Sequence, residues 1–261
     1  MIFNMKRSTY YAAIQNKPDK YESEKELIKQ IFHHHKGRYG YRRITVLVRR
    51  AGFALNHKTV KRLMNELGLK SCVRPKKYHS YKGIAGKGFP NILQRNFKTT
   101  GFNEKWVTDV TEFNINGQRI YLSALIDLYN QEVISYTISH RPTLNFVCKM
   151  LSNVFEKYNN LKGLIIHSDQ GWHYRTERYT QMLKMKDVTQ SMSRKGNCLD
   201  NCMAENFFSL LKTEFYYMNK FSSVEGFKKA LVEYIAYYNT ERIKIGLNGL
   251  SPIEFRAQYA A

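Results

Sequence analysis

With 261 residues, of which 43% are hydrophobic and 14% aromatic, the chain can bury one large core or two small ones, which excludes a disordered protein. No apolar run approaches the roughly 18 residues that span a bilayer, so no membrane segment is expected. Lys and Arg number 42 against 21 acidic residues, a net charge of +21, and this favours a large polyanion such as nucleic acid as partner.

The excess charge lies near the N-terminus. Residues 1–100 carry 23 basic and 5 acidic side chains, a net of +18, whereas the remaining 161 residues carry 19 and 16, a net of +3. Ribosome association or a merely soluble basic surface remain alternatives, and charge does not separate DNA from RNA.

The expected setting is the cytoplasm. The first residues lack a basic region followed by an apolar stretch, so we expect no secretion signal. Four cysteines have spacings that suggest no disulfide framework, which favours free thiols in a reducing cytosol.

Residues 1–70 are predicted to be helical. Apolar residues recur on one face in three segments, at 22–35, 42–50 and 56–68. Asn56 is a plausible N-cap of the third helix, whose opposite face carries Lys58, Lys61 and Arg62. A basic helix after a short turn is how a helix-turn-helix reads the major groove, although a basic three-helix bundle with a solvated face would have the same pattern.

Residues 71–98 are rich in Lys, Arg, Gly, Pro and Tyr and show no period, which predicts a basic linker. Beyond it, two β-rich runs at 106–113 and 119–127 flank Asn116-Gly117, a strong hairpin signal. Further strands are expected at 131–138, 163–167 and 188–192, and helices at 145–158, 177–186 and 201–215. This order predicts an α/β fold with a mixed sheet over residues 99–218, followed by a C-terminal helical extension at 219–261.

Three carboxylates stand where such a sheet could bring them together. Asp109 lies inside the first strand, where a charge is costly without a metal or a partner. Asp169 follows directly on a strand, at the end where α/β sheets place ligands. Glu205 sits one turn into the helix that Asp200 or Asn201 is expected to cap. Surface carboxylates or salt-bridge partners are the alternative interpretation.

Such a trio suits phosphodiester chemistry. Two divalent ions about 3.5–4 Å apart can activate a nucleophile and neutralise the leaving oxygen, and hard oxygen ligands suit Mg²⁺. Three carboxylates can hold two ions if one of them bridges. Lys212 lies on the same helix face as Glu205 and could bind a DNA phosphate, while Arg194 and Lys195 are expected in a DNA-contacting loop near the site.

These residues resemble a known family. The spacing of the three carboxylates, with 59 residues between Asp109 and Asp169 and 35 between Asp169 and Glu205, is similar to that in the retroviral-integrase-like core of bacterial insertion-sequence transposases. The surrounding motifs agree: WVTDVT at 106–111, HSDQG at 167–171, SMSRKGNC at 191–198, ENFF at 205–208 and LKTE at 211–214. Upstream, YGYRRI at 39–44 and the helix at 58–69 resemble the family's helix-turn-helix, which adds Arg42 and Arg43 to the expected DNA contacts.

The resemblance implies an RNase H-like fold with a mixed five-stranded sheet and flanking helices, preceded by an all-α helix-turn-helix domain. It also implies Mg²⁺-dependent 3′-end nicking and strand transfer, with two ions on Asp109, Asp169 and Glu205 and Mn²⁺ able to substitute, and with Lys212 contacting DNA. The implied partners are double-stranded DNA, further copies of this chain, and an upstream-frame protein or fusion segment. The implied place is the bacterial nucleoid.

Three other interpretations of the sequence are open. A catalytically inactive DNA-binding regulator could keep the same fold, but the intact trio argues against it. An RNase H-type nuclease acting on RNA–DNA hybrids fits the basic N-terminal region less well. His33, His34 and His35 could suggest a zinc module, but no C-x₂-C pair accompanies them and a polar helix end is the simpler interpretation.

Overall fold

The computed structural model describes residues 19–72, 89–194 and 197–259. The chain divides into two compact units, Met1–Val73 and Arg74–Ala261, which we call unit 1 and unit 2. Among the helices of the described residues, none is both long enough and apolar enough to span a bilayer.

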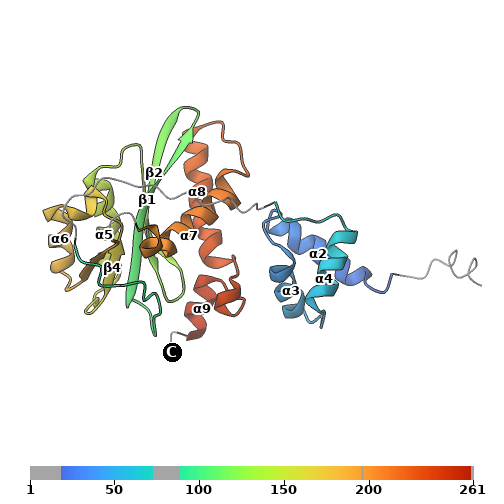
Figure 1. The fold of residues 1–261 in the computed structure, drawn as a ribbon. Coiled ribbons are helices and arrows are strands. Elements are labelled where there is room, and N and C mark those ends of the chain that lie inside the picture. The colour runs from blue at the N-terminus through green and yellow to red at the C-terminus, as the bar shows by residue number, and fades with distance from the viewer. Residues whose placement is uncertain (1–18, 73–88, 195–196, 260–261) are drawn as a thin grey trace, which may run out of the picture. The chain divides into compact units, whose positions relative to one another are not determined.

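The described residues of unit 1 form a bundle of three helices, α2 (Glu22–His34), α3 (Tyr41–Arg50) and α4 (His57–Glu66), which are labelled in Figure 1. Asn56 is the N-cap of α4, and its side chain accepts a hydrogen bond from the backbone N–H of Lys58, which confirms the predicted start of the third helix. The apolar stripes of the helices meet in one core: Ile28, Ile44, Val48, Val60 and Leu63.

Unit 2 contains a five-stranded sheet in the order β3-β2-β1-β4-β5. The strands are β1 (Lys105–Ile115), β2 (Gln118–Asp127), β3 (Val133–Ser139), β4 (Ile165–Ser168) and β5 (Thr189–Met192). The first three strands pair antiparallel, whereas β4 is parallel to both β1 and β5. The predicted mixed five-stranded sheet is confirmed.

The hairpin between β1 and β2 turns at Asn116 and Gly117. Both residues have positive φ angles, of 50° and 83°, and Asn and Gly adopt such angles at low cost in two-residue hairpin turns. The third strand begins at Val133 and not at the expected residue 131, because Gln131 has a φ of 58° and interrupts the extended backbone.

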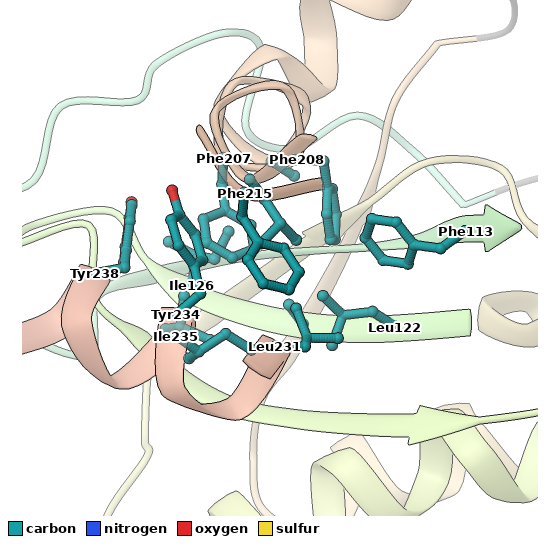
Figure 2. Close-up of a cluster of buried hydrophobic side chains, with 14 of the residues drawn as sticks. Phe113, Leu122, Ile126, Phe207, Phe208, Phe215, Leu231, Tyr234, Ile235 and Tyr238 are labelled. Atoms are coloured by element: carbon teal, nitrogen blue, oxygen red, sulfur yellow. The ribbon is translucent and has the colours of Figure 1, made fainter. Parts of the chain in front are cut away.

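Helices cover both faces of the sheet (Figure 1). The helices of unit 2 are α5 (Leu144–Lys157), α6 (Glu177–Lys184), α7 (Cys202–Leu211), α8 (Val224–Thr240) and α9 (Pro252–Tyr259). Because side chains alternate along a strand, Trp106 enters the core shared with α5 and α6, while Val107 enters the core shared with α7 and α8. Figure 2 shows the second core, in which Phe207 and Phe215 meet Leu231 over the sheet.

The helix expected at 201–215 is interrupted at both ends. A 3₁₀ turn (Cys198–Asn201) leads into α7, and a π-helical turn (Lys212–Tyr216) follows it. The prediction of a side-chain cap here is wrong. Asn201 occupies the N-cap position, but its side chain makes no capping hydrogen bond, and Asp200 is engaged by other partners described below.

The expected linker at 71–98 falls partly outside the described residues, which resume at residue 89. From there the chain packs against β5 within unit 2. Leu93 is 2% exposed, and the backbone N–H groups of Ile92 and Leu93 donate to the hydroxyl of Ser191 in β5 at 3.0 and 3.1 Å. A segment that lacks a hydrophobic period is therefore held by backbone and side-chain hydrogen bonds.

Candidate active site

Asp109 lies in β1, and Asp169 directly follows β4, the parallel strand that pairs with β1. In the pairing of β1 with β4, Val107 lies opposite His167. Asp109 is two residues beyond Val107, and Asp169 is two residues beyond His167, directly after the end of β4. Neighbouring strands lie about 4.7–4.9 Å apart, so the fold brings the two carboxylates together although 59 residues separate them.

Backbone N–H groups hold both carboxylates. The N–H of Val110 donates to Asp109 Oδ1 at 2.7 Å, and the N–H of Gly171 donates to Asp169 Oδ1 at 2.9 Å. A Cβ atom at position 171 would lie 2.8 Å from Asp169 Oδ1 and 3.2 Å from the ring of Tyr174. Glycine at this position lets the chain turn closely around the carboxylate.

Glu205 reaches the site from α7. This helix buries Ala204, Phe207 and Phe208 against the sheet, which leaves the side chain of Glu205 partly exposed beside β1. Lys212 follows in the π-helical turn, with its Nζ 5.7 Å from the ring centre of Phe113 in β1.

The three acidic groups interact electrostatically. Burial raises the pKa of Asp109 to about 8; the charges of Asp169 and Glu205 contribute to the increase, whereas the Val110 N–H and the charge of Lys212 oppose it. Burial also raises the pKa of Asp169, against the hydrogen bond from Gly171. Burial and the neighbouring Asp169 raise the pKa of Glu205. Like charges held this close are costly, and a divalent cation would relieve the cost.

The donor set suits hard cations, since carboxylate oxygens are ligands that Mg²⁺ prefers. Among the residues that the structure describes, no three His, Cys, Asp or Glu side chains are close enough to hold one ion. Asp109, Asp169 and Glu205 therefore act on one another as neighbouring charges, and in the described residues they do not form a closed three-ligand site.

The predicted DNA-contacting loop is only partly described. Lys195 lies outside the described residues. The guanidinium of Arg194 makes two hydrogen bonds of 2.9 Å to Asp200, although its side chain is 57% exposed. His167 near the site is buried between Ser191 and Ser193, at 2.9 and 3.2 Å, so it has a structural role in the described protein.

In unit 1 the predicted basic side chains are on α3 and α4. Lys58, Lys61, Arg62 and Arg42 are exposed, and Arg43 is half-buried with its guanidinium 5.2 Å from the ring centre of Tyr39. Arg62 is paired with Glu66 one turn further along α4. The positive surface therefore contains both an ion-paired side chain and side chains that point to solvent.

Sequence reasoning missed Asp200. Its carboxylate is fully buried and accepts hydrogen bonds from Asn91 and Arg95, more than a hundred positions away in the chain, and from Arg194, six positions away. Its position just before a helix resembled that of an ordinary cap, and no local pattern marks contacts across about a hundred residues.

Comparison with known proteins agrees with this architecture. Residues 19–78 match a family described as an HTH-like domain, and residues 100–198 and 205–259 match two families described as integrase core domains. A chain of the simian T-cell lymphotropic virus intasome structure superposes with a TM-score of 0.51 and 14% identity, covering 88% of this chain and 73% of that one. At that identity the likeness supports the fold alone: an integrase-like, RNase H-like core preceded by a helical HTH-like domain.

Proteins of similar sequence show which family the chain belongs to. The chain is 52% identical over 254 residues to a protein named transposase InsK of insertion sequence element IS150 from Escherichia coli, covering 97% of this chain and 90% of that protein. It is 35% identical over 249 residues to the transposase of insertion sequence element IS904 from Lactococcus lactis, covering 93% and 98%. The chain belongs to the family of insertion-sequence transposases.

Proposed function

We propose that the chain nicks the 3′ ends of its insertion sequence and transfers them to target DNA, and that Asp109, Asp169 and Glu205 are its metal ligands. The observation that carries the proposal is the position of Asp109 in β1 and of Asp169 directly after the neighbouring parallel strand β4, with the charge of Glu205 acting on Asp109 and that of Asp169 acting on Glu205. Two Mg²⁺ ions, for which Mn²⁺ could substitute, would supply the Lewis acidity that stabilises charge on the phosphate.

Within this proposal each side chain has a distinct task. Asp109, Asp169 and Glu205 would hold the ions, and the N–H of Val110 keeps one oxygen of Asp109 oriented. Asp169 would act from a strand end and Glu205 from a helix, which are rigid supports. Lys212 would bind a DNA phosphate beside them, because its charge lies close enough to act on Asp109. Arg194 and Lys195 would meet DNA at the edge of the same site.

The helix-turn-helix unit would bind the element ends. Lys58, Lys61 and Arg62 on α4, with Arg42 and Arg43 on α3, offer cations that neutralise phosphates on either side of a groove. Pairing two DNA ends requires at least two copies of the chain, and an upstream-frame protein or fusion segment would add end recognition. We place this activity at the bacterial nucleoid in the cytoplasm.

The test is cleavage and joining of DNA that carries the element ends, with and without Mg²⁺, for wild type, Asp109→Asn and Glu112→Gln. Glu112 is a matched control, because it lies on the same strand, is exposed, and pairs with Arg119 at 3.7 Å. Asp109→Asn should bind DNA normally and join no strands, whereas Glu112→Gln should join them at the wild-type rate.

The outcomes separate the alternatives. Joining at the wild-type rate by Asp109→Asn would overturn the ligand assignment. A wild-type protein that binds element ends but cuts nothing with Mg²⁺ or Mn²⁺ would favour the inactive regulator. Preferential cleavage of RNA–DNA hybrids would favour the RNase H-type nuclease.

A further inference from the structure

Asp200 is the most heavily engaged carboxylate near the proposed site. Its side chain is 0% exposed. Oδ1 accepts from Arg95 Nε at 2.8 Å and from Arg194 Nη2 at 2.9 Å. Oδ2 accepts from Asn91 Nδ2 at 2.8 Å and from the backbone N–H and Nε of Arg194, both at 2.9 Å. Hydrogen bonds from Arg194 hold the pKa of Asp200 well below its usual range, so the group stays charged.

These bonds join three stretches of chain. Asn91 and Arg95 belong to the segment before β1, which we call the docked segment (residues 89–97), Arg194 follows β5, and Asp200 precedes α7. Arg95 also donates through Nη2 to Asn197 at 2.9 Å. Two cations and an amide around one buried carboxylate leave it little freedom to move, because each bond is directional.

Asp200 is connected to Glu205 through the backbone. Asp200 lies in the 3₁₀ turn that runs directly into α7, and Glu205 is five residues further on. Movement of this turn would shift or fray the first turn of α7, which carries Glu205.

The docked segment is connected to the region of Asp169 through a series of hydrogen bonds. Ile92 and Leu93 donate to Ser191, whose hydroxyl is 2.9 Å from His167 Nδ1 in β4. The backbone N–H of Ser193 donates to the carbonyl of Ser168, the residue before Asp169. The docked segment is therefore bonded directly to Asp200 before α7, and through Ser191 of β5 to the strand that precedes Asp169.

We propose that Asp200 is a positioning residue which, held by the docked segment and Arg194, sets the place of Glu205 relative to Asp169. The proposal rests on the proposed function, since it takes Glu205 and Asp169 as metal ligands. Groups that orient ligands matter because a metal site tolerates displacements of only about half an ångström. Arg194 then serves the site through Asp200, in addition to any contact with DNA.

The test uses the full chain in three variants. Asp200→Asn removes the charge and keeps the shape, and Arg95→Ala removes two bonds through a side chain that is 42% exposed, so it should fold even if Asp200→Asn does not. Glu132→Gln is the control, because Glu132 is also a buried carboxylate with an arginine partner, Arg256 at 3.1 Å, but belongs to the β2–β3 connection.

Two readouts need no catalysis. Hydrogen exchange, followed by mass spectrometry of peptides covering 198–211, reports the order of α7, and electron paramagnetic resonance of free Mn²⁺ reports metal affinity without DNA. Asp200→Asn and Arg95→Ala should both speed exchange in this region and weaken Mn²⁺ binding by about 10- to 100-fold, as loss of an orienting group does. The concentration of Mg²⁺ at half-maximal cleavage should rise in parallel. Glu132→Gln should change neither exchange nor affinity.

Unchanged exchange at 198–211 in both variants overturns the positioning role, whatever the metal result. Wild-type Mn²⁺ affinity in both variants overturns it as well, provided that Asp109→Asn loses that affinity. A wild-type protein that binds no Mn²⁺, or an Asp109→Asn variant that binds it normally, instead overturns the proposed function, and the exchange data then still decide whether Asp200 orders α7.

Discussion

Arg242 and Glu214 form an ion pair in which both side chains are 1% exposed. Arg242 donates through Nε and Nη2 to the two carboxylate oxygens, each at 2.6 Å, and the hydroxyl of Tyr234 donates to Oε2 at 3.2 Å. The pair ties the π-helical turn after α7 to the residues that follow α8. This ion pair therefore links the C-terminal region to the turn that directly follows α7, the helix that carries Glu205.

Breaking this pair should be costly. Glu214→Met or Arg242→Met alone should lower the free energy of unfolding by about 3–5 kcal/mol, because each leaves a buried charge without its partner. The double variant Glu214→Met with Arg242→Met should recover most of that loss. Urea unfolding followed by circular dichroism measures all three, and losses that simply add would show that the two side chains are not coupled.

Gly171→Ala should damage the site without unfolding the protein. The added methyl group would lie 2.8 Å from Asp169 Oδ1, so the carboxylate must move. We expect Mn²⁺ affinity to fall by about tenfold or more with little change in thermal stability. Gly246→Ala is the matched control, because an added Cβ there meets nothing within 4 Å. Normal metal binding by Gly171→Ala would mean that Asp169 does not hold the metal.

Asp109 should make the metal-free protein less stable as the pH rises. Burial raises its pKa from 3.8 to about 8, so the folded chain keeps a proton that the unfolded chain loses near pH 4, and stability falls between these values. In EDTA at pH 8, Asp109→Asn should therefore melt at a higher temperature than wild type, with the difference shrinking toward pH 4. Mg²⁺ should raise the melting temperature of wild type and not of the variant; equal responses to Mg²⁺ would contradict metal binding at Asp109.

The basic face of α4 should govern the salt dependence of DNA binding. Replacing Lys58 and Lys61 with Ala should reduce the slope of log affinity against log salt by about 2, because each lost phosphate contact removes about 0.9. Fluorescence anisotropy over a salt series measures the slope. Lys29→Ala on α2, where Lys29 pairs with Glu26 at 3.4 Å, should leave it unchanged. An equal effect of Lys29→Ala would move the DNA-binding surface away from α4.

Local sequence patterns were enough to predict the helices and strands discussed below. Asn116-Gly117 between two β-rich runs predicted the hairpin, because few other residue pairs adopt two positive φ angles at low cost. The apolar stripes of α2, α3 and α4 predicted their helices to within two residues at each end, because the period of 3.6 is set by backbone geometry. The prediction of helix ends was poorer for α7, where the helix changes to a π-helical turn after Leu211.

Asp109, Asp169 and Glu205 could be predicted as candidate site residues because they lie beside strand and helix signals and because their spacing resembles that of a known family. The contacts of Asp200 could not be predicted. It was expected to cap a helix, and it instead binds side chains 109 and 105 positions away, at Asn91 and Arg95. The end of the expected linker likewise showed no period, yet it lies against β5.

The sequence by itself therefore determined the type and order of the elements, the excess positive charge before residue 100 and which carboxylates are candidates for the site. Only the tertiary structure decided which charges are neutralised by partners, how the docked segment joins β5 to α7, and that Asp109 lies in the strand beside the one that Asp169 follows. The reason is physical. Secondary structure depends on neighbours within a few residues, whereas a buried charge or a strand register depends on groups that meet only when the chain closes on itself.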